Sequence, residues 1–202
     1  MRRILGLCAL LAVMAVPAIA DALFAPPTPL INPETVKSGA KAMAQTFSLN
    51  GVDGTLEKTT FAQVQKRFGG QLRRQGDAGG SLAWLCYDLP ERHLRVWLSA
   101  GELHIDAGLI DTITIWSVTQ PANSAECPIP SGTQATAVDG ISPGQPWAAV
   151  QARLGAPGAS RDGWAAYSYD RHTGAFDRND YLVMKTDHGA VTNLQASRTT
   201  SN

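Results

Sequence analysis

The sequence lacks an excess of charge of either sign. Lysine and arginine together number 17, aspartate and glutamate also number 17, and the formal net charge is zero. Proteins that bind nucleic acids or anionic membrane surfaces usually carry a clear basic excess. We therefore expect neither a nucleic-acid partner nor electrostatic binding to a membrane.

Motifs that hold metals, phosphates or cofactors are also missing. The four histidines stand apart without H-E-x-x-H spacing, and no glycine-rich phosphate loop follows a candidate strand. The stretch DRHTGAFDRND at 170–180 contains three aspartates but lacks the alternating ligands and central glycine of a calcium loop. We expect no metal and no cofactor, and we predict that the chain is not an enzyme.

One pentapeptide, GISPG at 140–144, matches the G-x-S-x-G nucleophile elbow of serine hydrolases. That motif uses the N–H of the residue after the serine to form half of an oxyanion hole, and Pro143 has no N–H. The residues before it are too polar for the buried central strand of a hydrolase sheet. We therefore expect that Ser142 is not a nucleophile.

Cysteine is scarce, and one of the three cysteines lies in an N-terminal segment with its own signature. Residues 1–20 combine Arg2 and Arg3, an apolar run that contains Cys8, and a small-residue A-I-A end, which is typical of a secretory signal peptide. The apolar run is shorter than the ~20 residues that span a bilayer. These features predict a bacterial periplasmic or secreted protein, with no membrane insertion after signal cleavage.

Cys86 and Cys127 remain after signal removal. Two cysteines in an oxidising compartment indicate one disulfide, and free thiols or pairing between chains are the alternatives.

What the sequence does contain is an internal repeat. VDGTLEKTTFAQVQKRFG at 52–69 and VDGISPGQPWAAVQARLG at 138–155 are identical at eight of eighteen positions, at a constant offset of 86. Chance rarely produces so many matches without a gap, so we infer one structural unit used twice. Gly140 of GISPG is then the copy of Gly54, and its position in the repeat explains the pentapeptide.

Each copy predicts a short helix followed by strands. Phe61, Val64 and Phe68 form one apolar face, Trp147, Val150 and Leu154 form another, and Gly69 and Gly155 end the two helices. Thr59 or Thr60 can cap the first helix. The predicted strands form antiparallel meanders at 82–88, 94–99, 109–117, 164–169, 181–186 and 190–196, with a further candidate at 102–106.

Upstream, NPETVKSGAKAMAQTF at 32–47 predicts an additional helix with Val36, Ala40, Met43 and Phe47 on one face. The predicted fold class is α+β: two tandem repeats, each a short helix or helix pair packed on a small antiparallel sheet, with an extra N-terminal helix. The predicted organisation is a signal peptide at 1–20, an N-terminal extended segment and helix at 21–50, repeat unit 1 at 51–120, a linker at 121–137 and repeat unit 2 at 138–202.

The stretch GISPGQPWAAVQARLGAP, followed by a polar loop and strands, resembles the start of one unit of the β-lactamase-inhibitor-protein-like superfamily. That group includes tandem-repeat inhibitor proteins and small single-unit lipoproteins of outer-membrane assembly. The resemblance covers about residues 50–202, and the tandem arrangement favours the inhibitors. It implies two sheets side by side with the helices behind them, and an exposed sheet face that grips a partner protein.

The strand patterns allow a separate prediction of that face. In strands 94–99 and 109–117, aliphatic residues alternate with a polar set that includes tryptophans. A tryptophan on a polar, solvent-side face fits a protein-binding hot spot. The candidate partner-binding residues are Trp97, Trp116, Arg95, Trp84 and Trp164. The alternative is that the N-terminal segment or the linker covers the tryptophans.

These observations predict a protein-binding module, in its most concrete form an inhibitor or immunity protein of an envelope-acting hydrolase. The hydrolase could be a peptidoglycan-cleaving enzyme or a β-lactamase, and inhibition would be steric. The alternatives are an envelope-assembly or scaffold protein without inhibitory activity, and an enzyme whose site the sequence does not reveal.

Overall fold

A computed structural model describes residues 24–32, 35–39, 41–43, 45–77, 80–119, 124–133 and 135–201. The predicted signal peptide at 1–20 lies outside these ranges. The described chain forms eleven strands in two antiparallel sheets, accompanied by three short α-helices. The α+β class predicted from the sequence is therefore wrong, because the protein is β-rich.

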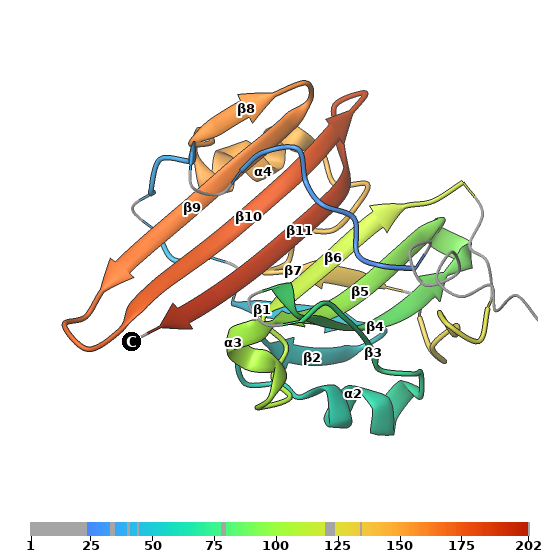
Figure 1. Cartoon of the computed structure of the whole chain (residues 1–202). Helices are drawn as coiled ribbons and strands as arrows, with labels where there is room; N and C mark the ends of the chain where they lie inside the picture. Colours follow the sequence, from blue (N-terminus) through green and yellow to red (C-terminus); the bar gives the residue numbers. More distant parts are fainter. Residues whose placement is uncertain are drawn as a thin grey trace, which may run out of the picture.

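The larger sheet has eight strands in the order β3-β4-β5-β6-β11-β10-β9-β8 (Figure 1). Their bounds are β3 (Arg73–Gln75), β4 (Leu82–Leu89), β5 (Leu94–Gly101), β6 (Thr112–Ser117), β8 (Ala159–Arg161), β9 (Trp164–His172), β10 (Asp177–Asp187) and β11 (Ala190–Ser201). β3 to β6 follow the first sequence copy and β8 to β11 the second, and the last strand of each group meets the other at the centre. β6 and β11 pair only from Leu194 opposite Ile115 to Ser197 opposite Thr112, so the end of β11 runs past the start of β6.

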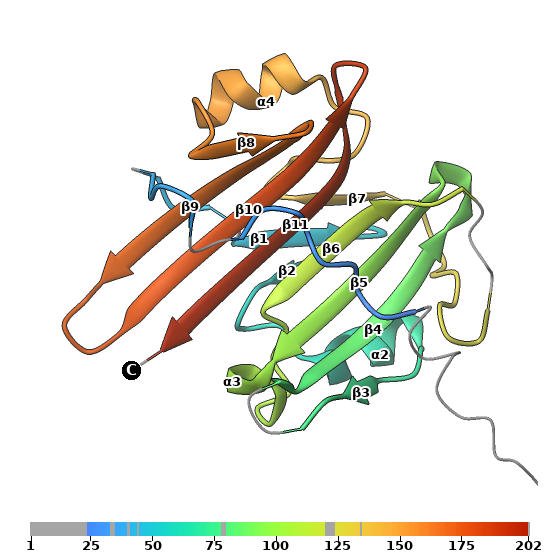
Figure 2. The ribbon, with the colours of Figure 1, turned by 45° about the horizontal axis from the view of Figure 1, so that its top comes forward.

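A smaller sheet lies behind the larger one (Figures 1 and 2). It contains β1 (Thr46–Leu49), β2 (Val52–Thr55) and β7 (Thr136–Val138), in the order β2-β1-β7. Phe47, Leu49 and Val138 of this sheet belong to the same buried cluster as the aliphatic side of the larger sheet. The sequence prediction missed this sheet because strands of three or four residues show little alternation. The fold is β-rich because the long strands of the larger sheet, together with this second sheet, far outweigh the three short helices.

Two eight-residue helices precede the strands of the two copies. They are α2 (Phe61–Phe68) and α4 (Trp147–Leu154). Thr60 caps α2 in a reciprocal capping box with Gln63, which settles the choice between Thr59 and Thr60. The third helix, α3 (Glu102–Ile105), occupies the candidate strand at 102–106, so that part of the strand prediction is wrong. No helix in the described chain is long and apolar enough to cross a membrane.

The additional helix predicted at 32–47 is also wrong; of the residues predicted on its apolar face, Ala40 lies outside the described residues. The described residues of this stretch form no α-helix, and they lead through an isolated bridge at Ser38 into β1. Val36 packs with Trp164 and Val183, whereas Met43 and Phe47 join the separate cluster behind the larger sheet. Because this one segment fills two different clusters, it runs extended, and tertiary contacts override its helical periodicity.

The two faces of the larger sheet differ in chemistry. The back face, which carries Leu98, Ile113 and Leu194, is buried and mainly aliphatic, with one buried ion pair between Asp180 and Arg198. The front face, which carries Trp97, Thr114 and Gln195, combines aromatic with hydroxyl and amide side chains. The register of β5, β6 and β11 places each of these sets on a single side of the sheet. The front face is the candidate for function, because side-chain polarity there is not needed for the core.

Candidate functional site

The N-terminal residues 24–31, FAPPTPLI, cross the front face as an extended segment that we call the strap (Figures 1 and 2). At its first end, the indole N–H of Trp97 donates to the carbonyl oxygen of Phe24 at 2.7 Å. At its other end, the hydroxyl of Tyr181 donates to the carbonyl oxygen of Ile31 at 2.8 Å. Proline restricts φ and lacks an N–H, so a proline-rich segment stays extended and offers mainly carbonyl groups. The strap is thus bound as an extended peptide by aromatic donors.

The predicted partner-binding tryptophans lie together on this face, but they are covered. Trp84, Trp97 and Trp164 are 1%, 4% and 4% exposed, and Trp116 is partly buried. Phe24 and Ala25 of the strap pack on Trp84 and Trp97, and Cys127 of the linker joins the same cluster. The face is therefore covered by the N-terminal segment and the linker, which is the alternative to an open binding surface.

The predicted disulfide between Cys86 and Cys127 is confirmed. It joins the front of β4 to the linker and holds the linker against the tryptophan cluster. The sequence indicated this pairing because only two cysteines follow the predicted signal peptide.

Arg95, the fifth predicted partner-binding residue, is also engaged in contacts within the protein. Its Nε and Nη2 atoms donate to the carboxylate of Asp88 at 2.6 and 3.1 Å, and both side chains are buried. The Phe24 ring lies 5.1 Å from the Arg95 guanidinium carbon. Such a bidentate ion pair fixes the planar guanidinium, which then supports the first end of the strap.

The other end of the strap rests on the second group of strands. Ile31 packs in a cluster with Trp164 and Tyr181, and the Trp116 ring lies 5.3 Å from the Trp164 ring. Burial raises the pKa of Tyr181 to about 12. Its hydroxyl therefore stays protonated, and available as a donor to the strap, well above neutral pH.

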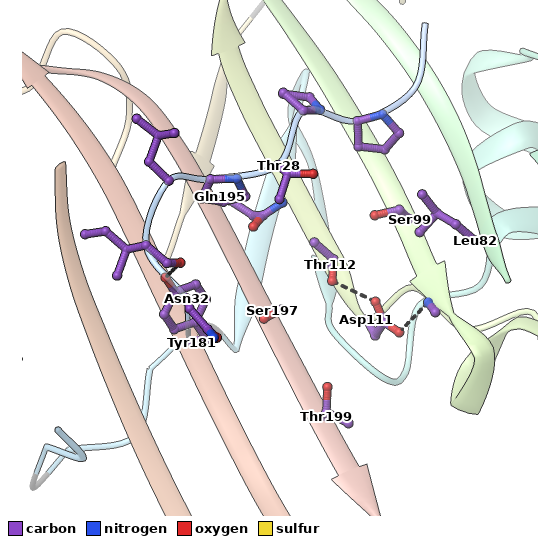
Figure 3. A pocket seen from close by; sticks show the side chains of 16 residues that line it. Thr28, Asn32, Leu82, Ser99, Asp111, Thr112, Tyr181, Gln195, Ser197 and Thr199 are labelled. Atoms are coloured by element: carbon purple, nitrogen blue, oxygen red, sulfur yellow. Dashed lines mark hydrogen bonds between the residues drawn. The ribbon is translucent and has the colours of Figure 1, made fainter. Parts of the chain in front are cut away.

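A pocket of about 640 Å³ opens between the middle of the strap and the centre of the sheet (Figure 3). It lies where the end of β11 runs past the start of β6. Its wall contains prolines and aliphatic residues from the strap and mostly small polar residues from the strands: Pro26, Pro27, Thr28, Pro29, Leu30, Ile31, Asn32, Leu82, Ser99, Gly101, Asp111, Thr112, Tyr181, Gln195, Ser197 and Thr199.

Asp111 is the charged residue of this wall. One carboxylate oxygen accepts from the hydroxyl of Thr112 at 2.7 Å, and the other accepts from the backbone N–H of Gly101 at 2.9 Å (Figure 3). The second oxygen also lies 3.2 Å from Nδ1 of His104. Burial is the main cause that raises the pKa of Asp111 above its usual value, against the opposing effect of these partners.

A chain of polar contacts continues behind Asp111. Nε2 of His104 lies 3.0 Å from Oε1 of Glu57. Glu57 in turn accepts from the backbone N–H and the hydroxyl of Thr200 at 2.6 and 2.7 Å. Both ring nitrogens of His104 are therefore placed at carboxylate oxygens, and none of these groups is left to act on a substrate as a free base.

The two segments that resemble a catalytic or metal-binding motif in the sequence, GISPG at 140–144 and the stretch 170–180, have other roles. Gly144 donates its N–H to the carbonyl oxygen of Val191, and Gln145 donates to that of Ser142, so the GISPG stretch forms a turn. Much of 170–180 extends β9 and β10, and a hydrogen bond to Asp177 raises the pKa of the exposed His172. In the part of the chain that the structure describes, no group of three or more His, Cys, Asp or Glu side chains could hold a metal ion.

Sequence reasoning found the front-face aromatics but missed the pocket. Asp111 precedes β6 and His104 lies in an unpredicted helix, so no spacing motif connects them to Glu57. Comparisons with protein-family models, with curated proteins and with solved structures find no match to this chain. Any proposal about function therefore depends on the geometry of the front face.

Proposed function

We propose that this chain is a non-enzymatic, extracytoplasmic protein that binds another protein through the front face of its eight-stranded sheet. In its most specific form, it is an inhibitor or immunity protein of an envelope-acting hydrolase. The observation that carries the proposal is the strap. The front face already holds an extended polypeptide through the N–H of Trp97 and the hydroxyl of Tyr181, which donate to its carbonyl groups. Proline-rich peptides are recognised in this way by aromatic grooves.

The polar groups of the pocket support binding rather than catalysis. The hydroxyls of Ser99, Ser197 and Thr199 have no hydrogen-bond partner among the described residues, whereas an activated nucleophile needs a base within reach. His104, a potential base, is engaged at both nitrogens by Asp111 and Glu57. The pocket therefore offers hydrogen bonds to a ligand without the arrangement that would activate one of its own hydroxyls.

The partner surface in this proposal consists of the strap and the open pocket beside it, instead of the tryptophans beneath the strap. Thr28 and Leu30 are exposed on the strap, and Ser197 and Thr199 are partly exposed on β11. A rigid sheet presents such a surface with little loss of conformational entropy on binding. A broad face that covers a hydrolase cleft would exclude substrate without any chemical step.

The test is capture of a partner from a bacterial envelope extract on the immobilised protein, followed by activity assays of the captured enzyme. We expect the purified protein to inhibit a captured peptidoglycan hydrolase or β-lactamase in proportion to its occupancy. If a partner binds with unchanged activity, the inhibitor form is wrong and only protein binding stands. If no protein is retained and the purified chain turns over a small substrate, the proposal is refuted.

Two substitutions of the same kind locate the surface. Thr28→Arg places a long side chain on the exposed strap, and Ala62→Arg places one on the exposed side of α2, away from the front face. We expect the first to weaken partner capture and the second to leave it unchanged. Equal loss in both variants would contradict binding through the front face.

A further inference from the structure

We propose that the pocket beside the strap binds a cationic group that donates several hydrogen bonds, and that this group is the end of an arginine or lysine side chain of the partner protein. The second half of this statement rests on the proposed function. The first half, the chemistry of the pocket, stands on the structure of the wall.

The strap side of the pocket consists mainly of hydrogen-bond acceptors. Residues 26–30 read PPTPL, which provides five backbone carbonyl groups but only two backbone N–H groups. Opposite the strap, the two obvious donors are already engaged. Tyr181 donates to Ile31, and the side-chain amide of Gln195 donates to Thr114. The strap side of the pocket therefore offers more acceptors than donors to a ligand.

The strand side of the pocket adds three hydroxyl groups that have no hydrogen-bond partner among the described residues. The Ser99 side chain is 2% exposed and lines the pocket, and its hydroxyl has no hydrogen-bond partner in the described chain (Figure 3). Because Ser99 lines the pocket, a ligand in the pocket can reach this hydroxyl. Ser197 and Thr199 line the same wall and also lack partners among the described residues. Each of these three hydroxyls can donate one hydrogen bond or accept from a ligand, so the preference for a donor-rich ligand rests on the strap carbonyls and on Asp111.

The charge in the pocket is negative. Asp111 is the one ionisable residue of carboxylate type on the described wall, and no Lys, Arg or His is among the wall residues. A carboxylate has about four lone-pair positions, and Asp111 uses three of them, for Gly101, Thr112 and His104. One position remains for a ligand.

The basic groups near the pocket do not balance its negative charge: both nearby arginines are paired elsewhere, and the one imidazole, His104, lies between the two carboxylates of Asp111 and Glu57. Arg95 is held by Asp88, and Arg198 is held by Asp180 on the back face at 2.8 Å. An anionic ligand would therefore meet uncompensated repulsion, whereas a guanidinium or ammonium group would meet a carboxylate and several oxygen acceptors. A volume of about 640 Å³ can hold one long side chain.

The probe for this chemistry is N-acetyl-arginine-N-methylamide, titrated into the purified protein and followed by NMR through the backbone amides of Gly101, Thr112 and Ser197. The control ligand is the citrulline analogue, which has nearly the same shape but no charge. We expect saturable shifts at these amides with the arginine compound and at least ~10-fold weaker binding of the citrulline compound. Equal binding of the two, or no shifts at these amides, would overturn the inference.

Two variants test the wall itself. Asp111→Asn removes the charge, and we expect it to weaken the arginine probe by ~10-fold or more, whereas Asp187→Asn removes an exposed carboxylate in the β10–β11 turn and should change nothing. Ser197→Phe fills the pocket without touching the contacts of Asp111, so it keeps the test valid if Asp111→Asn does not fold. Binding of the probe to the Ser197→Phe protein would contradict the assigned site.

Binding should also depend on pH in a defined direction. Asp111 faces His104 from α3, with Glu57 behind that ring and Tyr181 across the pocket. A bound cation favours the ionised carboxylate and lowers its raised pKa, so probe affinity should increase as the pH rises through the pKa of Asp111. A flat profile from pH 4 to 7 would contradict a contact with this carboxylate.

The two proposals fail separately. If the arginine probe binds at the pocket but no partner protein is captured, the pocket chemistry stands and the proposed function is wrong. If a partner is captured equally by the wild type and the Ser197→Phe variant, the function stands and the side-chain inference is wrong. If spermidine binds as well as the arginine probe and the variant leaves partner capture unchanged, the ligand is a free polyamine instead of a side chain.

Discussion

Replacement of Trp97 by alanine discriminates most sharply between a partner-binding surface and a covered one. An exposed tryptophan that contacts only a partner protein could be replaced by alanine with little effect on the free energy of unfolding. Trp97 is 4% exposed, packs with Trp84 and the Cys86–Cys127 disulfide, and donates to the Phe24 carbonyl. Truncation of a buried aromatic side chain to alanine usually costs about 3–5 kcal/mol in the free energy of unfolding. We therefore expect Trp97→Ala to fall within that range.

The assay is urea unfolding of the oxidised protein, followed by far-ultraviolet circular dichroism. Phe176→Ala is the matched control, because Phe176 is 49% exposed at the tip of the β9–β10 hairpin, and exposed substitutions usually stay within about 0.5 kcal/mol. Limited proteolysis adds a second measurement, since loss of the Phe24 anchor should expose the strap to cleavage. A Trp97→Ala loss below ~1 kcal/mol, with an uncleaved strap, would refute the packing of Trp97 beneath the strap.

The remaining predictions concern the disulfide and two buried ionisable groups. Mutation of Cys86 and Cys127 to serine should lower the free energy of unfolding by about 4 kcal/mol, from the entropy of closing a loop across 41 residues; an unchanged urea midpoint would contradict it. Burial raises the pKa of Tyr181 from 10.0 to about 12, so its neutral form contributes stability that is complete below pH 10 and is lost as the pH rises toward 12. Burial also raises the pKa of Tyr87 and Tyr167, so absorbance at the tyrosinate band should show several late-titrating tyrosines, one fewer in Tyr181→Phe, and proteolysis should detect alkaline release of the strap in the wild type. The pKa of Asp111 is raised above its model-compound value of 3.8, so its contribution to stability is greatest at low pH and falls as the pH rises through the folded-state pKa. The difference in unfolding free energy between the wild type and Asp111→Asn should therefore decrease from pH 3.5 upward, and an increase measured by urea unfolding would show that the sign is wrong.

The outcome of the strand predictions shows how far alternation can be used. The long strands β4, β5 and β9 begin at the predicted residues, because their alternating or fully apolar patterns are strong. The predicted strand 164–169 ends before β9 does, and the predicted strand 181–186 begins after β10 does, since the polar residues of 170–180 gave no hydrophobic signal although they pair across the hairpin. Strand pairing is satisfied by backbone groups, and it continues there without apolar side chains.

The pocket could not be derived from the sequence for a related reason. Asp111, Ser99 and Ser197 are far apart along the chain and belong to no motif, and each is an ordinary strand or turn residue when considered alone. They meet because β6 pairs with β11 over only four residues, after which the two groups of strands separate. The short pairing depends on strand length and twist, neither of which a local pattern records.

Local sequence was sufficient for features that depend on near neighbours: the capped helix at Phe61–Phe68, the helix before Gly155, the alternation of front and back residues along each strand, and the one available disulfide. Tertiary structure decided what covers each surface. The strap binds over the tryptophans because Trp97 and Tyr181, from opposite halves of the sheet, find carbonyl groups at its two ends, and a small second sheet closes the back. Such contacts join residues more than 70 positions apart. They form only in the folded chain, so a local sequence pattern cannot predict them.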